Sequence, residues 1–470
     1  MDKSLFVKDI LSRVDKPLVM YCVPRGFGKT VNLSMLDCFL NVEYQGTGLF
    51  EDLEISKNKD LYEIRNAFPV VYLDLQRLHG KNAEELKTNL AKAIEATVSE
   101  FPFELRRKQK DTDGTALLIR LISALSADFG KETVVIVDGW DATFRDYTRK
   151  CRDKMEVMNR FMNSVATAPG LYKAVFASVT IPESEVNLKN TDVVYGLLRP
   201  DPMFGFSDID VRKLIISDCV FDYVVKWYGG YGCGNYPILS PLCVTSFCMG
   251  NYKPGIYRDV SADRTLLEKI ISDLYTLNPT RYLRLLSDGK SEYEFRWQKL
   301  DVTCCDNTLN LLIQTGILSY DGKCVSIPNM QSKMIIRDFL SKRDPIDCES
   351  MTDLTHNLKH PSDKTVECLK NILSTVKHTA YLNLFLIDLV ANNQCSVSVR
   401  NIHCTYAYTV TIDECMDLVI IDATGTVFDE SVLSNVLSEI TDGMPDEENI
   451  LVGVVFDTGI HCVMYGPCGP

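Results

Sequence analysis

The sequence predicts an α/β fold in which helices cover both faces of a parallel sheet. Four apolar runs have the length and composition of buried strands: PLVMYCV (17–23), FPVVYLDL (68–75), ETVVIVD (132–138) and YKAVFASV (172–179). Stretches with helical periodicity separate them, and in 31–40 apolar residues recur at positions 33, 36 and 40. Because buried parallel strands are connected through helices, this alternation predicts the doubly covered sheet.

The length and composition of the chain set its broad class. With 470 residues the chain is too long for one core, and a domain size of about 150 residues suggests roughly three domains. No apolar run approaches the ~20 residues that a membrane span needs, and the N-terminus lacks the apolar stretch of a signal peptide. We therefore expect a soluble intracellular protein, of the cytoplasm or the nucleus, without membrane contact.

Cysteine usage agrees with a reducing compartment. The chain has 17 cysteines, an odd number, and they are scattered without any C-x-x-C pair. This pattern favours free buried thiols over a disulfide framework or a zinc site.

Charge is distributed unevenly along the chain. The net charge is -13, and residues 401–470 contain twelve Asp or Glu and no Lys or Arg. Such a segment repels the phosphate backbone of nucleic acids, so nucleic-acid binding is not expected of it. A solvated acidic surface explains the charge, and a surface for a basic protein partner is the alternative.

The segment YCVPRGFGKT (21–30) ends as a phosphate-binding loop, G-x-x-x-x-G-K-[ST], with Val23 where the first glycine would stand. Its strand–loop–helix context strengthens the motif. Backbone N–H groups of residues 25–29 would hold phosphates, Lys29 would reach the outer phosphates, and the Thr30 hydroxyl would bind magnesium. The predicted nucleotide-binding residues of the loop are Pro24, Arg25, Gly26, Phe27, Gly28, Lys29 and Thr30.

Asp138 completes the predicted site. It ends the strand ETVVIVD, where a carboxylate at the sheet edge would hold the water shell of magnesium beside Thr30. The alternative is an ordinary aspartate at a strand end or helix cap. With Lys29 and Thr30 it predicts a P-loop NTPase-type sheet that binds ATP and magnesium.

The motifs also carry a family resemblance. VPRGFGKTVNLSML resembles the R-P-R-R-F-G-K-[ST]-x-N-L-S-M-L signature of AAA-ATPase-like proteins with a C-terminal PD-(D/E)XK nuclease-like domain, in which the first loop glycine is usually absent. Further segments resemble the family in the same order: VVIVDGWDATF, MFGFSDIDVRKLI, WYGGYGCGNYPILSP, LNLLIQTGILSYDGKCVSIPN, ECMDLVIID and NILVGVVFD.

The resemblance implies an arrangement of domains. Residues 1–205 would form the AAA-ATPase-like P-loop domain, and 206–345 a helical lid with a winged-helix-like module. A linker would cover 346–365, and a small α/β nuclease-like domain 366–470, with strands in SVSVR, MDLVIID and ILVGVVFD.

Two departures from the family pattern bear on catalysis in the P-loop domain. The family has a glutamate that activates the attacking water where this chain has Gly139. A general base typically contributes ~10²- to 10⁴-fold in rate, so hydrolysis should be weak or absent, and Gly139→Glu should raise it. Asp141, which matches the family's second aspartate, is the candidate for a substitute catalytic base.

The nuclease-like domain also departs from its pattern. Asp417 fits its first carboxylate, but the following strand candidate GTVFDES offers Asp429 and Glu430 without the lysine that the E-x-K motif supplies. We expect a degenerate nuclease site at Asp417 and a divergent member of the family.

The sequence therefore predicts a nucleotide-dependent switch that binds ATP and magnesium, hydrolyses ATP weakly or not at all, and acts on a protein partner. A non-catalytic scaffold, in which neither site binds a ligand, is the alternative. An active ATP-dependent nuclease ranks last, because the acidic C-terminal segment lacks the required lysine.

Overall fold

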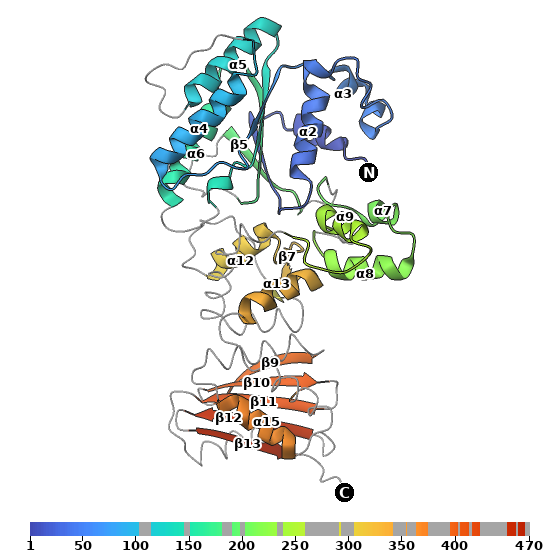
Figure 1. The fold of residues 1–470 in the computed structure, drawn as a ribbon, viewed down its shortest axis with the longest axis vertical. Helices are drawn as coiled ribbons and strands as arrows, with labels where there is room; N and C mark the ends of the chain where they lie inside the picture. Colours follow the sequence, from blue (N-terminus) through green and yellow to red (C-terminus); the bar gives the residue numbers. More distant parts are fainter. Residues whose placement is uncertain are drawn as a thin grey trace. The chain divides into compact units, whose positions relative to one another are not determined.

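The computed structural model of the chain is shown in Figure 1. It describes residues 1–102, 114–144, 151–180, 190–197, 203–232, 238–258, 291–292, 305–341, 354, 363–374, 395–402, 405–412, 416–423, 449–456 and 459–465. The chain divides into two compact units. The first comprises residues 1–267, 294–323 and 328–331, and the second 268–293, 324–327 and 332–470.

A five-stranded parallel sheet forms the centre of the first unit, in the order β2-β3-β4-β1-β5. Its strands are β1 (Leu18–Cys22), β2 (Val70–Asp74), β3 (Thr133–Asp138), β4 (Leu171–Ser178) and β5 (Thr191–Tyr195). Every residue of β1 and β3 is buried, as expected for strands covered on both faces. The four predicted strands are thereby confirmed, and β5 is an additional strand.

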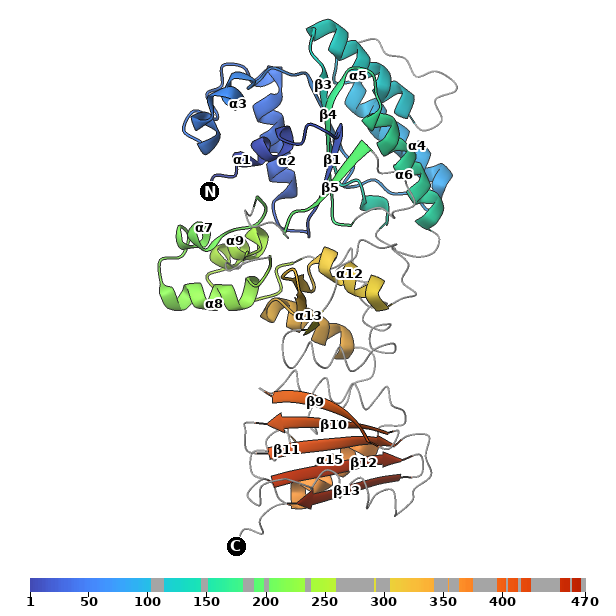
Figure 2. The ribbon, with the colours of Figure 1, turned by 180° about the vertical axis from the view of Figure 1, so that it is seen from behind.

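Helices cover both faces of this sheet, as predicted. On one side lie α1 (Leu5–Leu11), α2 (Lys29–Leu40) and α3 (Lys59–Glu63), with short 3-10 turns at Val42–Tyr44 and Glu54–Lys57. On the other side lie α4 (Ala83–Val98), α5 (Thr115–Phe129) and α6 (Cys151–Ala166) (Figure 2). A third 3-10 turn, Ala142–Phe144, follows β3.

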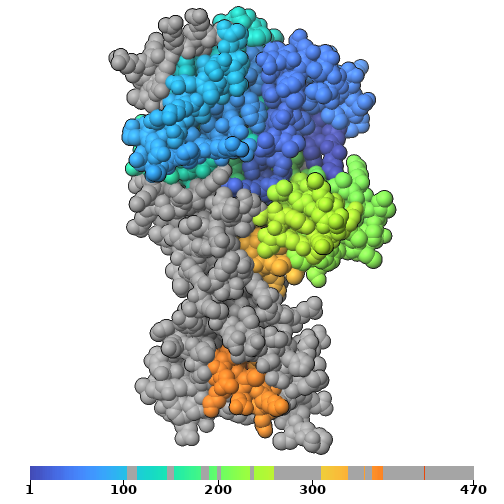
Figure 3. Space-filling view, viewed as in Figure 1, coloured from blue at the N-terminus to red at the C-terminus, as the bar shows by residue number. Residues whose placement is uncertain are grey.

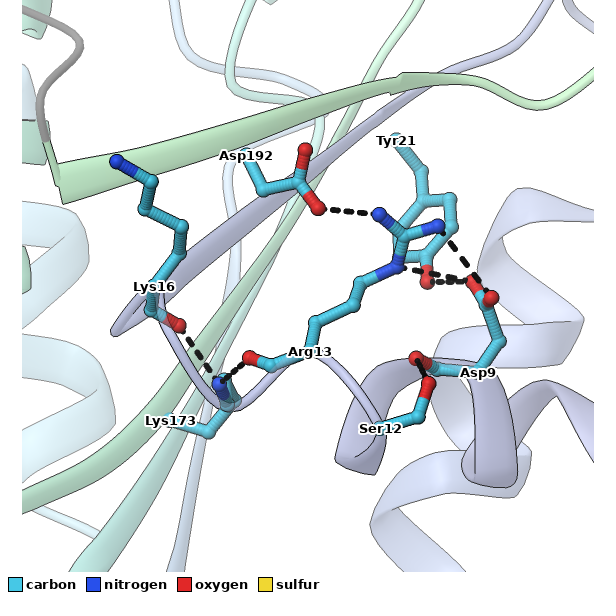
Figure 4. A network of polar contacts seen from close by, with 7 residues as sticks. All are labelled: Asp9, Ser12, Arg13, Lys16, Tyr21, Lys173 and Asp192. Carbon is cyan, nitrogen blue, oxygen red and sulfur yellow. Dashed lines mark hydrogen bonds and ion pairs between the residues drawn. The ribbon is translucent and has the colours of Figure 1, made fainter.

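A polar network ties α1 to the sheet (Figure 4). The Arg13 guanidinium, just after α1, pairs with Asp9 of that helix, at 3.2 Å between Nε and Oδ2, and with Asp192 of β5. The Tyr21 hydroxyl of β1 donates to Asp9 Oδ2 at 2.6 Å. Lys173 of β4 donates to the carbonyl oxygens of Arg13 and Lys16, at 2.6 Å each. Three strands thus hold the end of α1, and the buried Asp9 carboxylate has cationic and hydroxyl partners.

The lid, which we define as α7 (Asp208–Arg212), α8 (Asp218–Tyr228) and α9 (Pro241–Met249), follows the sheet in the chain. Ser207 and Asp210 form a capping box at the start of α7. Helices α8 and α9 share an apolar core in which Phe221, Val224 and Phe247 are buried. In Figure 3 the yellow-green surface of the lid lies against the blue surface of the N-terminal residues.

Helix α12 (Cys305–Thr315) and strand β7 (Ser319–Tyr320) also belong to the first unit, and residues in and beside them contact the sheet and the lid segment. The Tyr195 hydroxyl at the end of β5 donates to the carbonyl oxygen of Ile313 at 2.7 Å, and Tyr231 donates to that of Gly316 at 3.2 Å. The amide of Asn329 donates to the Gly229 carbonyl oxygen at 2.7 Å. Helix α13 (Met330–Ser341) begins at the end of this segment.

The second unit contains a mixed sheet of five strands in the order β13-β12-β11-β10-β9. The strands are β9 (Cys395–Ile402), β10 (Thr405–Ile412), β11 (Met416–Ala423), β12 (Asn449–Phe456) and β13 (Gly459–Tyr465). Only β11 and β12 pair in parallel, and α15 (Asp363–Ser374) packs on β12 and β13. Strand β6 (Ser291–Glu292) pairs antiparallel with β8 (Cys324–Ser326).

This sheet confirms the strands predicted in SVSVR, MDLVIID and ILVGVVFD. Asp417 lies at the second position of β11, between Thr411 of β10 and Ile450 of β12. The strand candidate GTVFDES, with Asp429 and Glu430, lies outside the described residues. The nuclease-like and winged-helix-like assignments and the predicted domain boundaries stay predictions.

The helices and the cysteines bear on the predicted cellular environment. Within the part of the chain that the structure describes, no helix is both long and apolar enough to cross a bilayer. Seven cysteines are described as free thiols, and two of them, Cys22 and Cys243, are buried.

Candidate functional site

The predicted phosphate-binding loop lies at the carboxyl edge of the parallel sheet, between the end of β1 and the start of α2. Ligands of open α/β sheets bind at this edge. Helix α2 begins at Lys29, so the unpaired N–H groups of its first turn and the positive end of its dipole lie at the loop. The structure thus has the strand–loop–helix geometry that the sequence predicted for residues 24–30.

The lid contacts the loop directly. A Cβ added at Gly26 would lie only 3.0 Å from Leu242 Cβ, so α9 approaches the loop as closely as a glycine permits. The N–H of Leu242 donates to the Gly26 carbonyl oxygen at 3.1 Å, and the Ser240 hydroxyl donates to the same oxygen at 3.3 Å. The buried Phe27 ring meets Tyr231 edge to face at 4.9 Å. These contacts fix the loop conformation through residues more than 200 positions away in sequence.

Val23, in place of the first loop glycine, has a packing role. Its side chain is fully buried, and its N–H donates to the Ser178 carbonyl oxygen at 3.0 Å. A Cβ added at Gly196 would lie 2.7 Å from Val23 Cγ2, so the valine fills the space beside that glycine. The missing loop glycine therefore corresponds to a well-packed side chain.

Lys29 is the first residue of α2, at the end of the loop. Its ammonium donates to the carbonyl oxygens of Val23 and Pro24, at 2.7 and 3.0 Å. Burial lowers the pKa of Lys29 to about 8, although the carboxylates of Asp141 and Asp138 partly offset this effect. A partly buried ammonium with neutral carbonyl partners would gain from an added anion such as a phosphate.

Thr30, Asp138 and Gln76 converge on one point at the sheet edge. The Thr30 hydroxyl donates to Asp138 Oδ2 at 2.6 Å. The Gln76 amide donates to the same Oδ2 at 2.7 Å and to Thr30 Oγ1 at 3.1 Å. Burial raises the pKa of Asp138, against the lowering effects of Thr30, Lys29 and Gln76. The sequence predicted the first two residues but not Gln76.

This group of side chains fits a magnesium ion. Hydroxyl, carboxylate and amide oxygens are the ligands that Mg²⁺ takes in proteins, usually together with waters and substrate phosphates. The raised pKa of Asp138 marks a buried carboxylate that a cation would stabilise. Thr30 and Asp138 would hold the ion, whose positive charge would favour the binding of nucleotide phosphates.

Gln76 enters the site through the pairing of β2 with β3. Asp74 stands opposite Asp138 in the parallel register, and the Leu75 N–H donates to the Asp138 carbonyl oxygen at 2.8 Å. Asp74 Oδ1 then accepts from the Gln76 N–H at 2.9 Å and turns the chain toward Thr30. The available sequence signal was a polar residue directly after an apolar strand, since neighbouring parallel strands end at the same edge.

The surroundings of Gly139 argue against the expectation that Gly139→Glu would raise hydrolysis, which stays untested. Gly139 has φ +79°, and a Cβ added there would lie 2.7 Å from Gln76 Cα and 2.8 Å from Gln76 N. Real Cβ atoms do not approach backbone atoms so closely. A side chain at residue 139 therefore requires the ends of β2 and β3 to move apart, and the position cannot simply accept a catalytic glutamate.

Asp141, the candidate substitute base, has structural partners. Its Oδ2 accepts hydrogen bonds from the N–H groups of Val179 and Thr180, at 3.0 Å each, and from the Thr180 hydroxyl at 3.1 Å. The carboxylate is buried and anchors the segment after β4. These contacts define a positioning role, and the catalytic role of Asp141 stays a prediction.

Arg25, another predicted nucleotide-binding residue, is partly buried in the loop.

Comparison with known proteins agrees with the loop geometry. Residues 1–179 match the family model described as Predicted AAA-ATPase. No curated protein matches the sequence. The chain thus carries an AAA-ATPase-like domain over residues 1–179, and its parallel sheet and loop have an α/β P-loop NTPase-like fold.

Solved structures with some similarity include the ORC2 protein of Aeropyrum pernix. In its ADPNP and ADP complexes it is 11% identical, with a TM-score of 0.28 over 73% of this chain and 93% of that one. In its ADP form the same protein is 10% identical, with a TM-score of 0.29 over 72% of this chain and 91% of that one. A chain in the structure of Drosophila ORC bound to poly(dA/dT) DNA and Cdc6 is 12% identical, with a TM-score of 0.21 over 78% of this chain and 59% of that one. TM-scores this low do not establish a shared overall fold.

Proposed function

We propose that this protein binds ATP with magnesium and acts as a nucleotide-dependent switch with weak or absent hydrolysis. The observation that carries the proposal is the convergence of Thr30, Asp138 and Lys29 at the carboxyl edge of the sheet. The Thr30 hydroxyl lies 2.6 Å from Asp138 Oδ2, although 108 residues separate them in sequence. A phosphate loop, a partly buried cation and a hydroxyl–carboxylate pair that could hold magnesium are the parts that nucleotide binding requires.

Weak hydrolysis follows from the groups around the expected position of the attacking water. Gly139 has no side chain to serve as a base, and the closely packed backbone of Gln76 excludes one. The Asp141 carboxylate already accepts three hydrogen bonds. Without a positioned base the rate should fall by ~10²- to 10⁴-fold relative to a P-loop ATPase that has one.

The switch would act through the lid. Gly26 of the loop accepts hydrogen bonds from Ser240 and Leu242 of the α9 segment, so a phosphate that moves the loop also moves the lid contacts. Occupancy would then favour one arrangement of loop and lid over another, which is how a ligand shifts a population. The recipient of the signal is a protein partner in this proposal.

For the second unit we propose an inactive nuclease-like domain. Asp417 lies on β11, and residues 401–470 offer no lysine for an E-x-K motif. The twelve acidic residues there disfavour nucleic acid, which leaves a basic protein or solvent as the neighbour of this segment. We place the protein inside the cell, in the cytoplasm or the nucleus.

Thermal unfolding with ATP and magnesium tests the proposal. A ligand that binds only the native state at a hundredfold excess over its Kd stabilises it by about 2.7 kcal/mol. The wild type should show such a shift, and Lys29→Ala should abolish it without loss of fold. Lys57→Ala is the matched control, because Lys57 is exposed and far from the loop in sequence. A wild type that does not respond to millimolar ATP would favour the non-catalytic scaffold.

A further inference from the structure

Residues 203–206 lead from the sheet into the lid, and we call them the hinge segment. They come directly before α7, the first helix of the lid. At the lid end of the segment, Phe206 pairs with Leu239 through two backbone hydrogen bonds of 2.9 Å each. One residue earlier, the Gly205 N–H donates to the Phe27 carbonyl oxygen of the phosphate loop at 3.1 Å. The chain thus passes from a loop contact to a lid contact within two residues.

Asn32 ties the first residue of the hinge segment to α2. Its side-chain amide donates to the Met203 carbonyl oxygen at 2.9 Å, although 171 residues separate the two in sequence. Asn32 is 5% exposed and lies in the first turn of α2, three residues after Lys29. Residues three apart are neighbours on a helix surface. The side chain that would reach the phosphates and the side chain that holds the hinge segment therefore belong to one helical turn.

Other contacts hold the hinge segment from a second side. The buried Phe204 ring packs against Phe6 of α1 and Tyr21 of β1, with ring centroids 5.3 and 5.5 Å apart. Lys3, just before α1, pairs with Asp210 of α7 at 3.0 Å. None of these contacts involves the phosphate loop, so they can keep the segment in place while the contacts on the loop side change.

The packing at Gly205 leaves no free space between the loop and the lid segment. A Cβ added at Gly205 would overlap Ile238 Cγ2 of the lid segment and would lie 3.2 Å from Phe27 Cδ1 of the loop. Closely packed interiors transmit a displacement instead of absorbing it. A shift of the loop therefore has to be taken up by a movement of the lid segment.

We propose that residues 203–206 are the hinge of a lid movement and that Asn32 couples this hinge to nucleotide occupancy. The inference rests on the proposed nucleotide binding and names the route by which occupancy reaches the lid. Phosphate binds the first-turn N–H groups of α2 and the Lys29 ammonium, and Asn32 in the same turn carries the resulting shift to Met203. Because a carbonyl oxygen that loses its donor away from water is costly, the start of α2 and the hinge move together. Asn32 is a positioning residue, since it contacts the hinge and not the nucleotide.

Hydrogen–deuterium exchange of the lid amides, with and without saturating ATP and magnesium, tests the proposal. In the wild type, ATP should change the exchange rates in α8 and α9 by about fivefold or more, the lower end of typical coupling between two sites. Asn32→Ala should still bind ATP in isothermal titration calorimetry, but ATP should change its lid exchange rates by less than about twofold. A purely structural role of Asn32 would raise lid exchange in both conditions and leave the ratio between them unchanged.

Two further variants keep the test decisive. Asn41→Ala is the matched control, because Asn41 is a buried asparagine at the other end of α2 whose amide donates to Asp37 Oδ1 at 3.1 Å. It should keep the full response of the lid to ATP. Asn32→Thr removes the amide but has a similar volume and a hydroxyl that can bond within its own helix, so it serves if Asn32→Ala does not fold.

Each opposing result has a distinct meaning. If the wild type does not bind ATP, the proposed function is wrong, and the coupling role of Asn32 is wrong with it. If the wild type binds ATP but lid exchange does not respond, or if Asn32→Ala responds as the wild type does, the coupling role is wrong while nucleotide binding stands. If Asn41→Ala also loses the response, a general weakening of α2 explains the result and the assignment of Asn32 is overturned.

Discussion

A side chain at residue 139 should destabilise the protein rather than restore catalysis. Gly139→Ala places a Cβ in a backbone with φ +79°, which costs about 1–2 kcal/mol for a residue other than glycine. The same Cβ would lie 2.7 Å from Gln76 Cα, so β2 and β3 must separate, at a typical overpacking cost of about 1–3 kcal/mol. The two terms together predict a loss of about 2–5 kcal/mol.

Gly130→Ala separates the two terms. Gly130 ends α5 with φ +61°, and no atom lies within 4 Å of a Cβ added there. This control has only the backbone cost of about 1–2 kcal/mol. Because 1 kcal/mol shifts the Tm of a domain of 150–250 residues by roughly 2–4 °C, Gly139→Ala should melt several degrees below Gly130→Ala. Differential scanning fluorimetry or calorimetry measures the difference.

Gly139→Glu extends the comparison to function. We expect it to melt at least as low as Gly139→Ala and to show no increase in phosphate release from ATP. If Gly139→Ala melts at the temperature of Gly130→Ala, the close approach of Gln76 to residue 139 is refuted. A stable Gly139→Glu protein with raised hydrolysis would refute the structural argument and support the simpler comparison of motifs.

Four other predictions follow from the same region and from the second unit. Burial lowers the pKa of Lys29 to about 8, below its usual ~10.4. Between these two pH values the unfolded chain binds more protons than the folded protein. The free energy of unfolding, measured without nucleotide, should therefore rise with pH across this window. ATP affinity should fall over the same window, since phosphate needs the ammonium, whereas Lys29→Arg stays charged and should show no such decline in titrations at about pH 7 and 9.5. Asp141→Ala leaves two buried N–H groups unpaired and should lower the free energy of unfolding by about 2–4 kcal/mol, whereas a purely catalytic role would lower ATP turnover and leave the Tm unchanged. No cleavage of single- or double-stranded DNA or RNA is expected with magnesium or manganese at low salt, and cleavage that Asp417→Ala removes would contradict the inactive nuclease-like domain.

The sequence predicted the sheet well because its strands are buried on both faces. Such strands read as continuous apolar runs, and four of the five carry one. Strand β5, TDVVY, was missed because it opens with two polar residues, of which Asp192 pairs with Arg13, just after α1. That partner lies almost 180 residues away, and local sequence patterns do not reveal contacts at such distances.

The site was predictable to the extent that its chemistry is local. Lys29 and Thr30 belong to one loop, and Asp138 ends an apolar strand, so their types and positions were sufficient. Predicting Gln76 would have required the strand register that places Asp74 opposite Asp138. Predicting the steric obstacle at Gly139 would have required its positive φ and its distance to Gln76, and a comparison of motifs contains neither.

The role of the lid is physically linked to the state of Lys29. The Lys29 ammonium donates to the Val23 and Pro24 carbonyl oxygens, and the Leu242 N–H of the lid donates to the Gly26 carbonyl oxygen, three residues before Lys29. A phosphate at the loop competes for the ammonium and for the first-turn N–H groups of α2, so it changes the contacts on one side of a loop whose other side is fixed by α9. If hydrolysis lacks a base, as we propose, the arrangement set by binding would persist until the nucleotide leaves. The lifetime of the switch would then depend on the rate of nucleotide dissociation rather than on the rate of chemistry.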